Sequence, residues 1–516
     1  MTVKLSERLL RLQGAISNNP DQVPQSIIDY KGWMPDRAAL GNPGELEATN
    51  VRPTEDGYGP LPDQNVQATA LDARCQGAAA ISSAAGVVTT YAGDEKKLYG
   101  IGAAGTPTDL SVSGGYSTAA DGQWEFTQFD QTFIATNYDD PVQGITVGGT
   151  QFANLIDSAD KPRFRHIDVV RDFLVGGNST DATDGDKPNR VWWSGYRDAT
   201  DFTPAASTQC DFEDIEEGGW VQKIVGGVEY GLIFQERQIT RMSYIGPPIV
   251  FQLDTIDRKR GTPIPGSVVA FGRLVFFYSD DGFMMNDGVQ TIPIGHRAVD
   301  RKFNTDFNTT YIGRCFSAID PINKIVMWSF PGESQSTPGE PNRVWFFNWA
   351  ENKWAEAELD LQLVYRALTP GLTLDELDTI STDLDALPFS LDSRAWTGGA
   401  LIAGSFNSAS RLSHFSGSNL AATIDTGERQ LFRGQKAEVT GARPYVDGGT
   451  PTVTVGSRDS PQGTNSFGSA VAVDATGFSA QLVEGRYHRL RTIVPAAASW
   501  NHAQGIEVFG VGTGVQ

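Results

Sequence analysis

Short apolar runs that end at polar turns recur along the middle of the chain. In residues 219–295, the apolar run 231–234 meets the polar turn 236–238, and the apolar run 274–278 meets the turn 279–282. A second short apolar stretch follows each turn. Two apolar stretches around a polar turn predict a β-hairpin, so this region predicts the same hairpin twice.

The hairpin pattern continues on both sides of this region. One strand position per unit, at Phe133, Phe173, Leu232, Leu274 and Ile325, gives spacings of 40, 59, 42 and 51 residues. A supersecondary unit that recurs every 40 to 50 residues or so is typical of four-stranded propeller blades. About seven such units fit between residues 77 and 430, which predicts a β-propeller of six or seven blades.

A second repeat supports this prediction. The segment PNRVWWSG (188–195) recurs as PNRVWFFNW (341–349), and each is a Pro-Asn turn that leads into an aromatic strand. In a structural repeat, equivalent strands are expected to carry such similar segments.

The two ends of the chain have a different pattern. After residue 434, short alternating strands separated by Gly and Pro predict a small β-sandwich. Residues 1–18 predict either an amphipathic helix that packs on a neighbouring subunit or a frayed end, and the Pro- and Gly-rich residues 29–65 predict a loop. The expected organisation is an all-β chain with an extended N-terminal arm (1–65), a β-propeller (66–433) and a C-terminal β-sandwich (434–516).

The composition restricts the partners and the compartment. The net charge is −21, whereas a protein that holds DNA through its phosphates needs an excess of Lys and Arg. An acidic surface that DNA passes without being held remains compatible with this charge. No apolar run approaches the roughly 18 residues needed to cross a bilayer, and the N-terminus lacks the apolar segment of a signal peptide. We expect synthesis in the cytoplasm and no membrane-spanning segment.

The residue types that carry catalysis and metal binding are scattered. Cysteines occur at 75, 210 and 315, and histidines at 166, 296, 414, 488 and 502, without the spacing of a zinc site or of a disulfide framework. Buried free thiols are therefore favoured. The chain has no G-x-S-x-G elbow, no phosphate-binding loop and no H-E-x-x-H motif. We expect no catalytic residue, no cofactor, no metal ligand and no enzymatic activity.

Four segments permit a functional alternative. The acidic cluster Glu213, Asp214, Glu216 and Glu217 offers carboxylates for glycan hydrolysis, but a charged loop is favoured. The segment 279–282 (SDDG) is similar to the aspartate box of sialidase-like propellers, which is itself a structural turn. The Leu-Asp steps of 372–396 favour a solvated loop over a calcium loop, because the calcium-loop glycine is missing. Arg486, Arg489 and Arg491 predict either a basic docking patch or ordinary strand exposure.

Several segments resemble a family of tailed-phage virion proteins. They include ATNVRPTEDGYGPLP (48–62), FQERQITRMSYIGPP (234–248), YSDDGFMMNDG (278–288) and GRYHRLRTIVPAAASWNHAQGIEV (485–508). The resemblance extends from about residue 33 to about residue 510. In architecture the chain also resembles the tail nozzle or tail-hub proteins of short-tailed phages, which are also called packaged-DNA stabilisation proteins.

The resemblance implies a structural role in the virion. It implies a propeller subunit that forms a ring, with six copies expected, below the portal and adaptor, where the ring continues the DNA channel and helps to retain the packaged genome. It also implies attachment of tail fibre or needle proteins, and transient passage of double-stranded DNA without sequence-specific binding. The main alternative is a receptor-binding or fibre-attachment protein of the same virion. A propeller glycan hydrolase is a remote alternative.

Overall fold

The chain folds almost entirely as β-strands. The computed structural model describes residues 27–335, 337–369, 399 and 401–514. In this part of the chain, the helices are α2 (Asp300–Asp306) and the short 3-10 turns η1 (Pro265–Ser267) and η2 (Thr309–Arg314). The expected N-terminal helix (1–18) and the expected loop (372–396) lie outside the described residues. The all-β prediction is confirmed.

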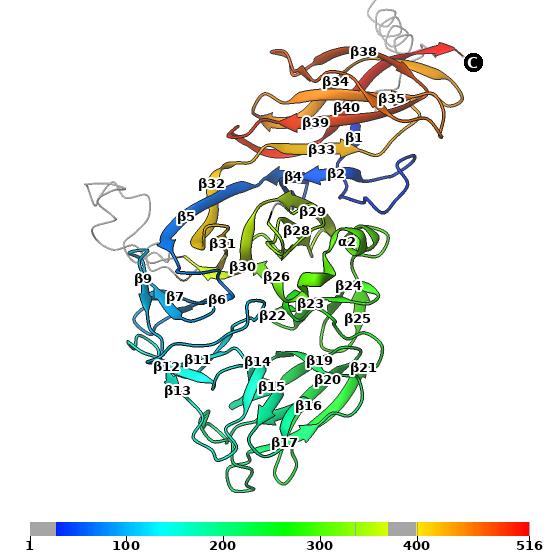
Figure 1. Cartoon of the computed structure of the whole chain (residues 1–516). Coiled ribbons are helices and arrows are strands. Elements are labelled where there is room, and N and C mark those ends of the chain that lie inside the picture. The colour runs from blue at the N-terminus through cyan, green and yellow to red at the C-terminus, as the bar shows by residue number, and fades with distance from the viewer. Residues whose placement is uncertain (1–26, 336, 370–398, 400, 515–516) are drawn as a thin grey trace, which may run out of the picture.

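Consecutive antiparallel strands form a series of four-stranded sheets in the lower body of Figure 1. The first two sheets contain β6 (Gly77–Ser82), β7 (Val88–Gly93), β8 (Leu98–Ile101) and β9 (Pro107–Asp109), then β10 (Glu125–Phe129), β11 (Thr132–Thr136), β12 (Gln143–Thr146) and β13 (Ala153–Asn154). The next contains β14 (Arg163–Val170), β15 (Phe173–Asp181), β16 (Gly185–Trp193) and β17 (Asp211–Asp214). The hairpins of residues 219–295 form β18 (Val221–Val225), β19 (Tyr230–Gln235), β20 (Ile239–Gly246) and β21 (Val250–Asp257), then β22 (Val269–Phe271), β23 (Leu274–Ser279), β24 (Gly282–Asn286) and β25 (Thr291–Pro293).

Two further units complete this body. One contains β26 (Phe316–Asp320), β27 (Ile325–Phe330), β28 (Arg343–Asn348) and β29 (Lys353–Glu358). The other contains β30 (Leu361–Leu368), β31 (Leu401–Asn407), β32 (Arg411–Asn419) and, as its fourth strand, β5 (Pro62–Ala70). The two PNRVW segments lie in β16 and β28, each the third strand of its unit, as expected for equivalent positions of a repeat.

The units pack side by side through their first strands. Strand β30 contacts β6, β6 contacts β10, β10 contacts β14 and β14 contacts β18, while β22 contacts β26 and β26 contacts β30. The sheets that begin with β18 and β22 share an apolar cluster, in which the rings of Phe234 and Phe277 lie 5.0 Å apart. The sheets are thus arranged in a propeller-like manner.

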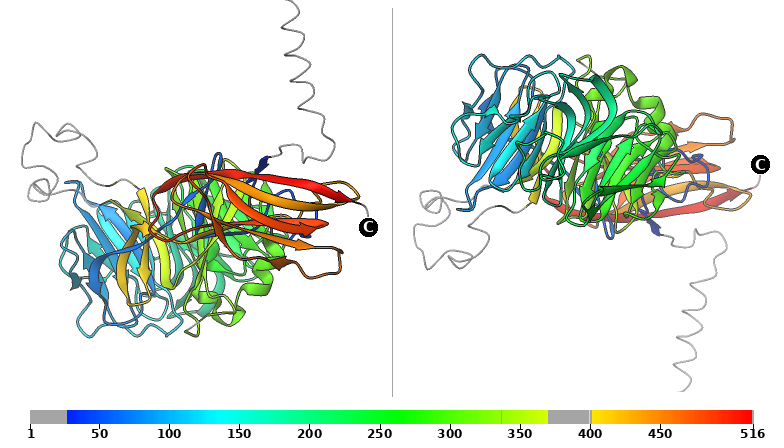
Figure 2. Two further views of the ribbon diagram at one scale, coloured as in Figure 1. Left: turned by 90° about the horizontal axis from the view of Figure 1, so that it is seen from above. Right: turned by 90° about the horizontal axis from the view of Figure 1, so that it is seen from below.

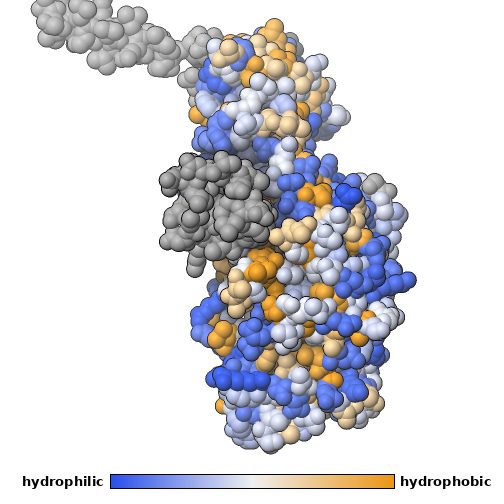
Figure 3. Space-filling view, turned by 90° about the vertical axis from the view of Figure 1, so that its left-hand side faces the viewer, coloured by the Kyte–Doolittle hydropathy of each residue, from blue (hydrophilic) through white to orange (hydrophobic). Residues whose placement is uncertain are grey.

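The upper body of Figure 1 is formed by strands from both ends of the chain. One sheet continues from β29 through β2 (Glu45–Thr49), β33 (Ala422–Thr426), β39 (Tyr487–Val494) and β35 (Thr452–Arg458) to the short strands β36 (Ser466–Phe467) and β37 (Val471–Ala472). The other contains β3 (Val51–Thr54), β4 (Gly57–Pro60), β40 (Trp500–Gly514), β34 (Lys436–Gly448), β38 (Ser479–Gly485) and, paired with β40, β1 (Ile27–Asp29). Figure 1 shows these two sheets at one end of the molecule, the left view of Figure 2 shows them from above, in front of the lower body, and Figure 3 shows the narrower region between the bodies.

The prediction of a loop over residues 29–65 is wrong. This segment contains β2, β3, β4 and the start of β5, in spite of its prolines and glycines. These strands are stabilised by partners far along the chain, since β2 pairs with β33 and β5 pairs with β32, where Val66 lies opposite Ser413. Tertiary pairing therefore overrides the local turn composition. The domain limits at 65/66 and 433/434 stay predictions.

One large apolar core connects the two bodies. Phe283 of β24 lies at its centre, with ring centroids 4.8 Å from Trp328, 5.1 Å from Trp354 and 4.9 Å from Phe303 of α2. The same cluster continues through Trp33 into the sandwich-like sheets, where Val453 and Val508 are buried. Because an aromatic side chain buries about 150–250 Å² when it enters a core, this cluster holds the lower and upper bodies as one packed unit.

Candidate functional site

The cysteines have the environment of inert core residues. Cys75, Cys210 and Cys315 are all buried and free, which confirms the expectation of buried thiols. Burial raises the pKa of each thiol to about 12, so the reactive thiolate is not populated near neutral pH. Among the described residues, no group of three His, Cys, Asp or Glu side chains is placed to hold a metal ion. No helix in this part of the chain is long and apolar enough to cross a membrane.

The acidic cluster is partly a strand rather than a loop. Glu213 and Asp214 lie in β17, and the Asp214 carboxylate accepts hydrogen bonds of 2.6 and 3.1 Å from Arg190. Arg190 also contacts Asp184 at 2.6 Å, and it lies over the ring of Phe212. The expectation of a charged loop is therefore wrong for these two residues, because β17 pairs with β16 and brings Asp214 beside a buried guanidinium group.

The segment SDDG forms the turn between β23 and β24. Ser279 pairs with Gly282, which has a φ of +108°. A Cβ atom at Gly282 would lie 2.3 Å from the Asp300 carboxylate, so both the backbone angle and the space require glycine. The structure thus gives this segment the role of a hairpin turn.

The arginines of the C-terminal strands, for which a basic docking patch was one alternative, are largely neutralised. Arg489 and Arg491 both contact the buried carboxylate of Asp425, at 2.6 and 3.0 Å, and Arg491 also contacts Glu47 at 3.1 Å. Burial raises the pKa of Asp425, although both guanidinium groups act in the opposite direction. Two of the three arginines are therefore occupied inside the sheet and are not offered to an anionic partner, because β39 pairs with β33 and places them beside this aspartate.

A cavity opens where the first strands of several sheets begin. It has a volume of about 550 Å³, and we call it the axial pocket. Its walls come from β14, from the start of β18, and from the segments that precede β10, β22 and β26. Gln123 lines both this pocket and a smaller cavity of about 190 Å³ between the first strands, and its Nε2 donates a hydrogen bond to the Gly313 carbonyl. The two cavities therefore adjoin at Gln123.

Trp220 is presented to the axial pocket by a rigid turn. The preceding Gly218 and Gly219 have φ angles of +90° and +88°, which strongly favour glycine. The buried side-chain amide of Gln235 donates hydrogen bonds of 2.7 Å to the carbonyls of Gly219 and Glu217. The Trp220 carbonyl accepts a hydrogen bond of 3.1 Å from the backbone of Glu236. The indole is 55% exposed, so this turn presents a large aromatic ring at the surface of a cavity.

Three charged or titratable side chains meet behind this pocket. Glu125 of β10 contacts Nδ1 of His166 at 2.8 Å and Nζ of Lys223 at 2.6 Å, and it accepts a hydrogen bond of 3.2 Å from the Ile167 amide. Burial acts to raise the pKa of Glu125, but Lys223 and His166 outweigh it and hold the pKa at about 2. The carboxylate is therefore ionised and fully occupied, which suits a structural contact better than proton transfer at neutral pH.

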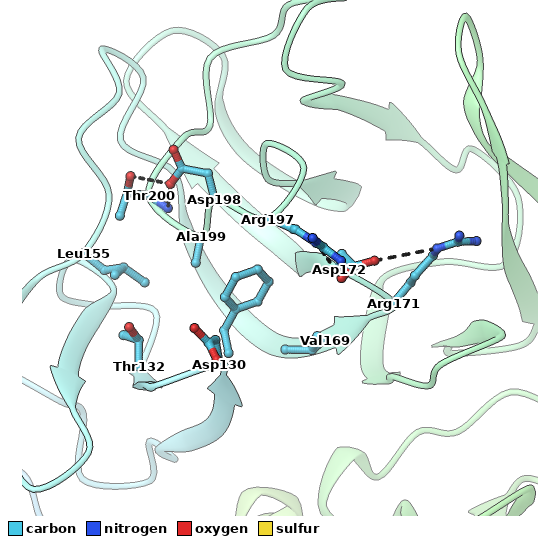
Figure 4. A pocket seen from close by; sticks show the side chains of 11 residues that line it. Asp130, Thr132, Leu155, Val169, Arg171, Asp172, Arg197, Asp198, Ala199 and Thr200 are labelled. Atoms are coloured by element: carbon cyan, nitrogen blue, oxygen red, sulfur yellow. Dashed lines mark hydrogen bonds and ion pairs between the residues drawn. The ribbon is translucent and has the colours of Figure 1, made fainter.

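A second cavity lies at the opposite ends of β10 and β14, at the hairpin turns (Figure 4). Its volume is about 660 Å³. Figure 4 shows Arg171 and Arg197 pointing toward Asp172, with nitrogen–oxygen distances of 3.8 and 3.2 Å. Asp198 accepts a hydrogen bond of 2.7 Å from Thr200. The cavity is thus lined by charged groups that already pair with one another.

The axial pocket was not found by reasoning from the sequence. The Gly-Gly-Trp segment follows the acidic cluster directly, and the paired glycines are the one local signal for it. His166 stands alone in the sequence, because Glu125 and Lys223 come from other sheets. A scan of protein-family models finds none that matches this chain, and a search of curated proteins finds no significant match.

Proposed function

We propose that this chain is a structural protein of a phage tail, of the nozzle or hub class. In this proposal it forms a ring of six copies below the portal and adaptor, continues the DNA channel, and anchors fibre or needle proteins. The resemblance of its sequence segments to tailed-phage virion proteins is the basis for this assignment. We further propose that it has no enzymatic activity and resides in the virion after synthesis in the host cytoplasm.

The proposed subunit is a seven-bladed β-propeller carrying a β-sandwich. Among the described residues, six separate four-stranded sheets and the strands β26–β29, which continue into the upper body, support this count. Their first strands are β6, β10, β14, β18, β22, β26 and β30. Strand β5 comes from the N-terminal side of the first unit and completes the last one. Such a strand joins the two ends of a ring of sheets, and so protects the edges that would otherwise remain unpaired.

The continuous core between the two bodies is the observation that best supports a structural role. A linker between the bodies would permit movement, whereas here β29 lies beside β2 in one sheet and one apolar cluster spans both bodies. The two bodies therefore share one packed core instead of being joined by a linker, which fits a structural role. Ring formation additionally requires complementary surfaces on two different faces of each subunit.

The charge of the chain fits the passage of DNA. At a net charge of −21, an acidic lumen repels phosphates, so DNA passes without being held. The expected result of a filter-binding assay at physiological salt is no retention of double-stranded DNA by the purified protein. Tight, salt-sensitive retention would contradict the proposed lumen, and labelling of this chain at the tail periphery would contradict its proposed place on the tail axis.

A receptor-binding protein of the same virion is the second candidate. The exposed indole of Trp220 at the axial pocket favours it, because an exposed aromatic ring beside a cavity is suited to ligand contact. The remote candidate, a glycan hydrolase, requires two available carboxylates beside one substrate. Glu125 is held by Lys223 and His166, so Asp139 and Glu236 at the axial pocket are the carboxylates that this candidate would have to use. Release of reducing sugar from host polysaccharide would revive that candidate.

A further inference from the structure

We propose that the axial pocket binds a neutral hexose unit of a saccharide, with the face of the sugar ring against the indole of Trp220. This inference goes beyond a structural role, and it does not depend on the subunit number or on the place of the chain in a tail. It rests on the exposed indole at the cavity, on polar side chains around it that have hydrogen-bonding capacity left, and on the size of the cavity.

The Trp220 turn is prepared before any ligand arrives. Two consecutive glycines with positive φ, the two hydrogen bonds from Gln235 and the backbone bond from Glu236 define the backbone of this turn. A tryptophan on a loop without such bonds would lose backbone freedom on binding. The hydrogen-bonded turn reduces this backbone part of the loss. The carbon-bound hydrogens on one face of a hexose are the natural contact for an indole face.

Polar side chains with free capacity surround the indole. In the part of the chain that the structure describes, neither the Gln222 amide nor the Glu236 carboxylate makes a side-chain hydrogen bond or ion pair, and both line the axial pocket. Arg165 lines it from the other side, with its guanidinium group 3.9 Å from the ring centroid of Tyr138. An amide, a carboxylate and a guanidinium group together supply donors and acceptors for several sugar hydroxyl groups.

The cavity dimensions and charge favour a neutral sugar. A volume of about 550 Å³ falls within the roughly 300–1,000 Å³ of small-ligand pockets. The carboxylates of Asp139 and Glu236 both line the cavity with Arg165, while Asp121 is paired with Arg314 at 2.7 Å. Two carboxylates against one unpaired guanidinium group disfavour a phosphate or a uronic acid. A protein side chain from a neighbouring copy is disfavoured as well, because an apolar side chain would leave Gln222 and Glu236 without partners.

Saturation-transfer difference NMR on the full-length protein tests the proposal. The probes are the methyl glycosides of glucose, galactose, mannose and N-acetylglucosamine at millimolar concentration. We expect saturation of the ring protons of at least one glycoside, a loss of affinity of at least tenfold in Trp220→Ala, and a smaller loss in Gln222→Ala. Tyr196→Ala is the control, because Tyr196 is also an exposed aromatic residue but does not line the axial pocket.

The outcomes separate the possibilities. Absence of transfer to all four glycosides overturns the proposal, and so does transfer that Trp220→Ala leaves unchanged. A Trp220→Ala protein that loses self-association while the parent protein binds none of the glycosides would instead identify a contact between copies. Unchanged thermal unfolding of Trp220→Ala, expected for a side chain that is 55% exposed, shows that a loss of sugar binding is local.

Discussion

The carboxyl group of Glu45 makes the stability of the upper body dependent on pH. Glu45 lies at the start of β2 and is almost completely buried. Its carboxylate oxygens accept hydrogen bonds of 3.0 Å from the Lys31 amide, 2.7 Å from the Gly32 amide and 2.8 Å from the Tyr58 hydroxyl. Through these three contacts, the Glu45 side chain binds both the segment that precedes β2 and strand β4. Burial nevertheless outweighs them and raises the pKa of Glu45 to about 7.

The direction and size of the effect follow from this pKa. Between pH 4.5 and about 7, the folded chain keeps the Glu45 proton while the unfolded chain has lost it. Stability from this group is therefore greatest below pH 4.5, falls as the pH rises through this window, and is constant above it. At about 1.4 kcal/mol per pH unit, the whole window corresponds to a decrease of about 3 kcal/mol.

Glu45→Gln removes the titration and keeps the size of the side chain. Hydrogen exchange measured by mass spectrometry on peptides from β2 and β4, at pH 5, 6, 7 and 8, gives the free energy of local opening after correction for intrinsic exchange. We expect this free energy to fall by about 3 kcal/mol with rising pH in the parent protein but not in Glu45→Gln. The variant loses an accepted hydrogen bond, which lowers its free energy of local opening by the same amount at every pH. The comparison therefore uses only the slope of this free energy against pH. Equal slopes in the two proteins would refute the reasoning.

Three further substitutions test the lower body by chemical denaturation. Lys223→Met leaves the buried Glu125 carboxylate without its ammonium partner, so we expect a loss of about 3 kcal/mol at pH 7 and a smaller loss near pH 3. Gly176→Ala places a Cβ atom 2.4 Å from the Phe164 ring, and overpacking of this kind costs about 1–3 kcal/mol. Phe283→Ala empties the centre of the aromatic core, for which we expect a loss of about 3–5 kcal/mol.

Each of these substitutions has a matched control. Lys96→Met removes an exposed ammonium group, Gly102→Ala adds a Cβ atom that meets nothing within 4 Å, and Phe271→Ala removes a ring that is 38% exposed. We expect Lys96→Met and Gly102→Ala to change stability by less than about 0.5 kcal/mol. Phe271→Ala, whose ring lies 6.0 Å from that of Trp349, is expected to cost clearly less than Phe283→Ala. A control that destabilises as much as its core counterpart would mean that burial and close contact do not determine these effects.

The repeating part of the fold could be predicted because each hairpin is encoded by residues that are close together in the sequence. Strands β19 and β23 are apolar runs, and each is followed within a few residues by a polar turn. After the turn that follows β23, β24 completes the hairpin. Such a pattern depends on neighbours in the sequence. The equivalence of the two PNRVW segments is likewise a comparison of short stretches.

The strands formed by the N-terminal segment could not be predicted in this way. Strand β5 has no apolar run, and its sequence PDQNVQATA is mostly exposed or half-buried. Its partner β32 lies more than 300 residues away in the sequence, so its strand conformation depends on a contact that no local window contains. The same limit explains why the sequence left the role of the three arginines open, because Asp425 neutralises Arg489 and Arg491 from a different strand.

The axial pocket could not be predicted from the sequence for a related reason. Its polar lining is assembled from several sheets, and only the glycines before Trp220 signal it locally. Gln222 can be recognised as a pocket residue only from the folded structure, in which it lines the same cavity as Arg165 and Tyr138.

The number and arrangement of subunits test the proposed function most directly. Cryo-electron microscopy of the virion that contains this chain, or of the purified assembly, measures both. The proposal predicts a closed ring of six copies on the tail axis, with an acidic lumen wide enough for double-stranded DNA. Copies in groups of three at the tail periphery, or a basic channel wall that contacts the DNA tightly, would contradict it.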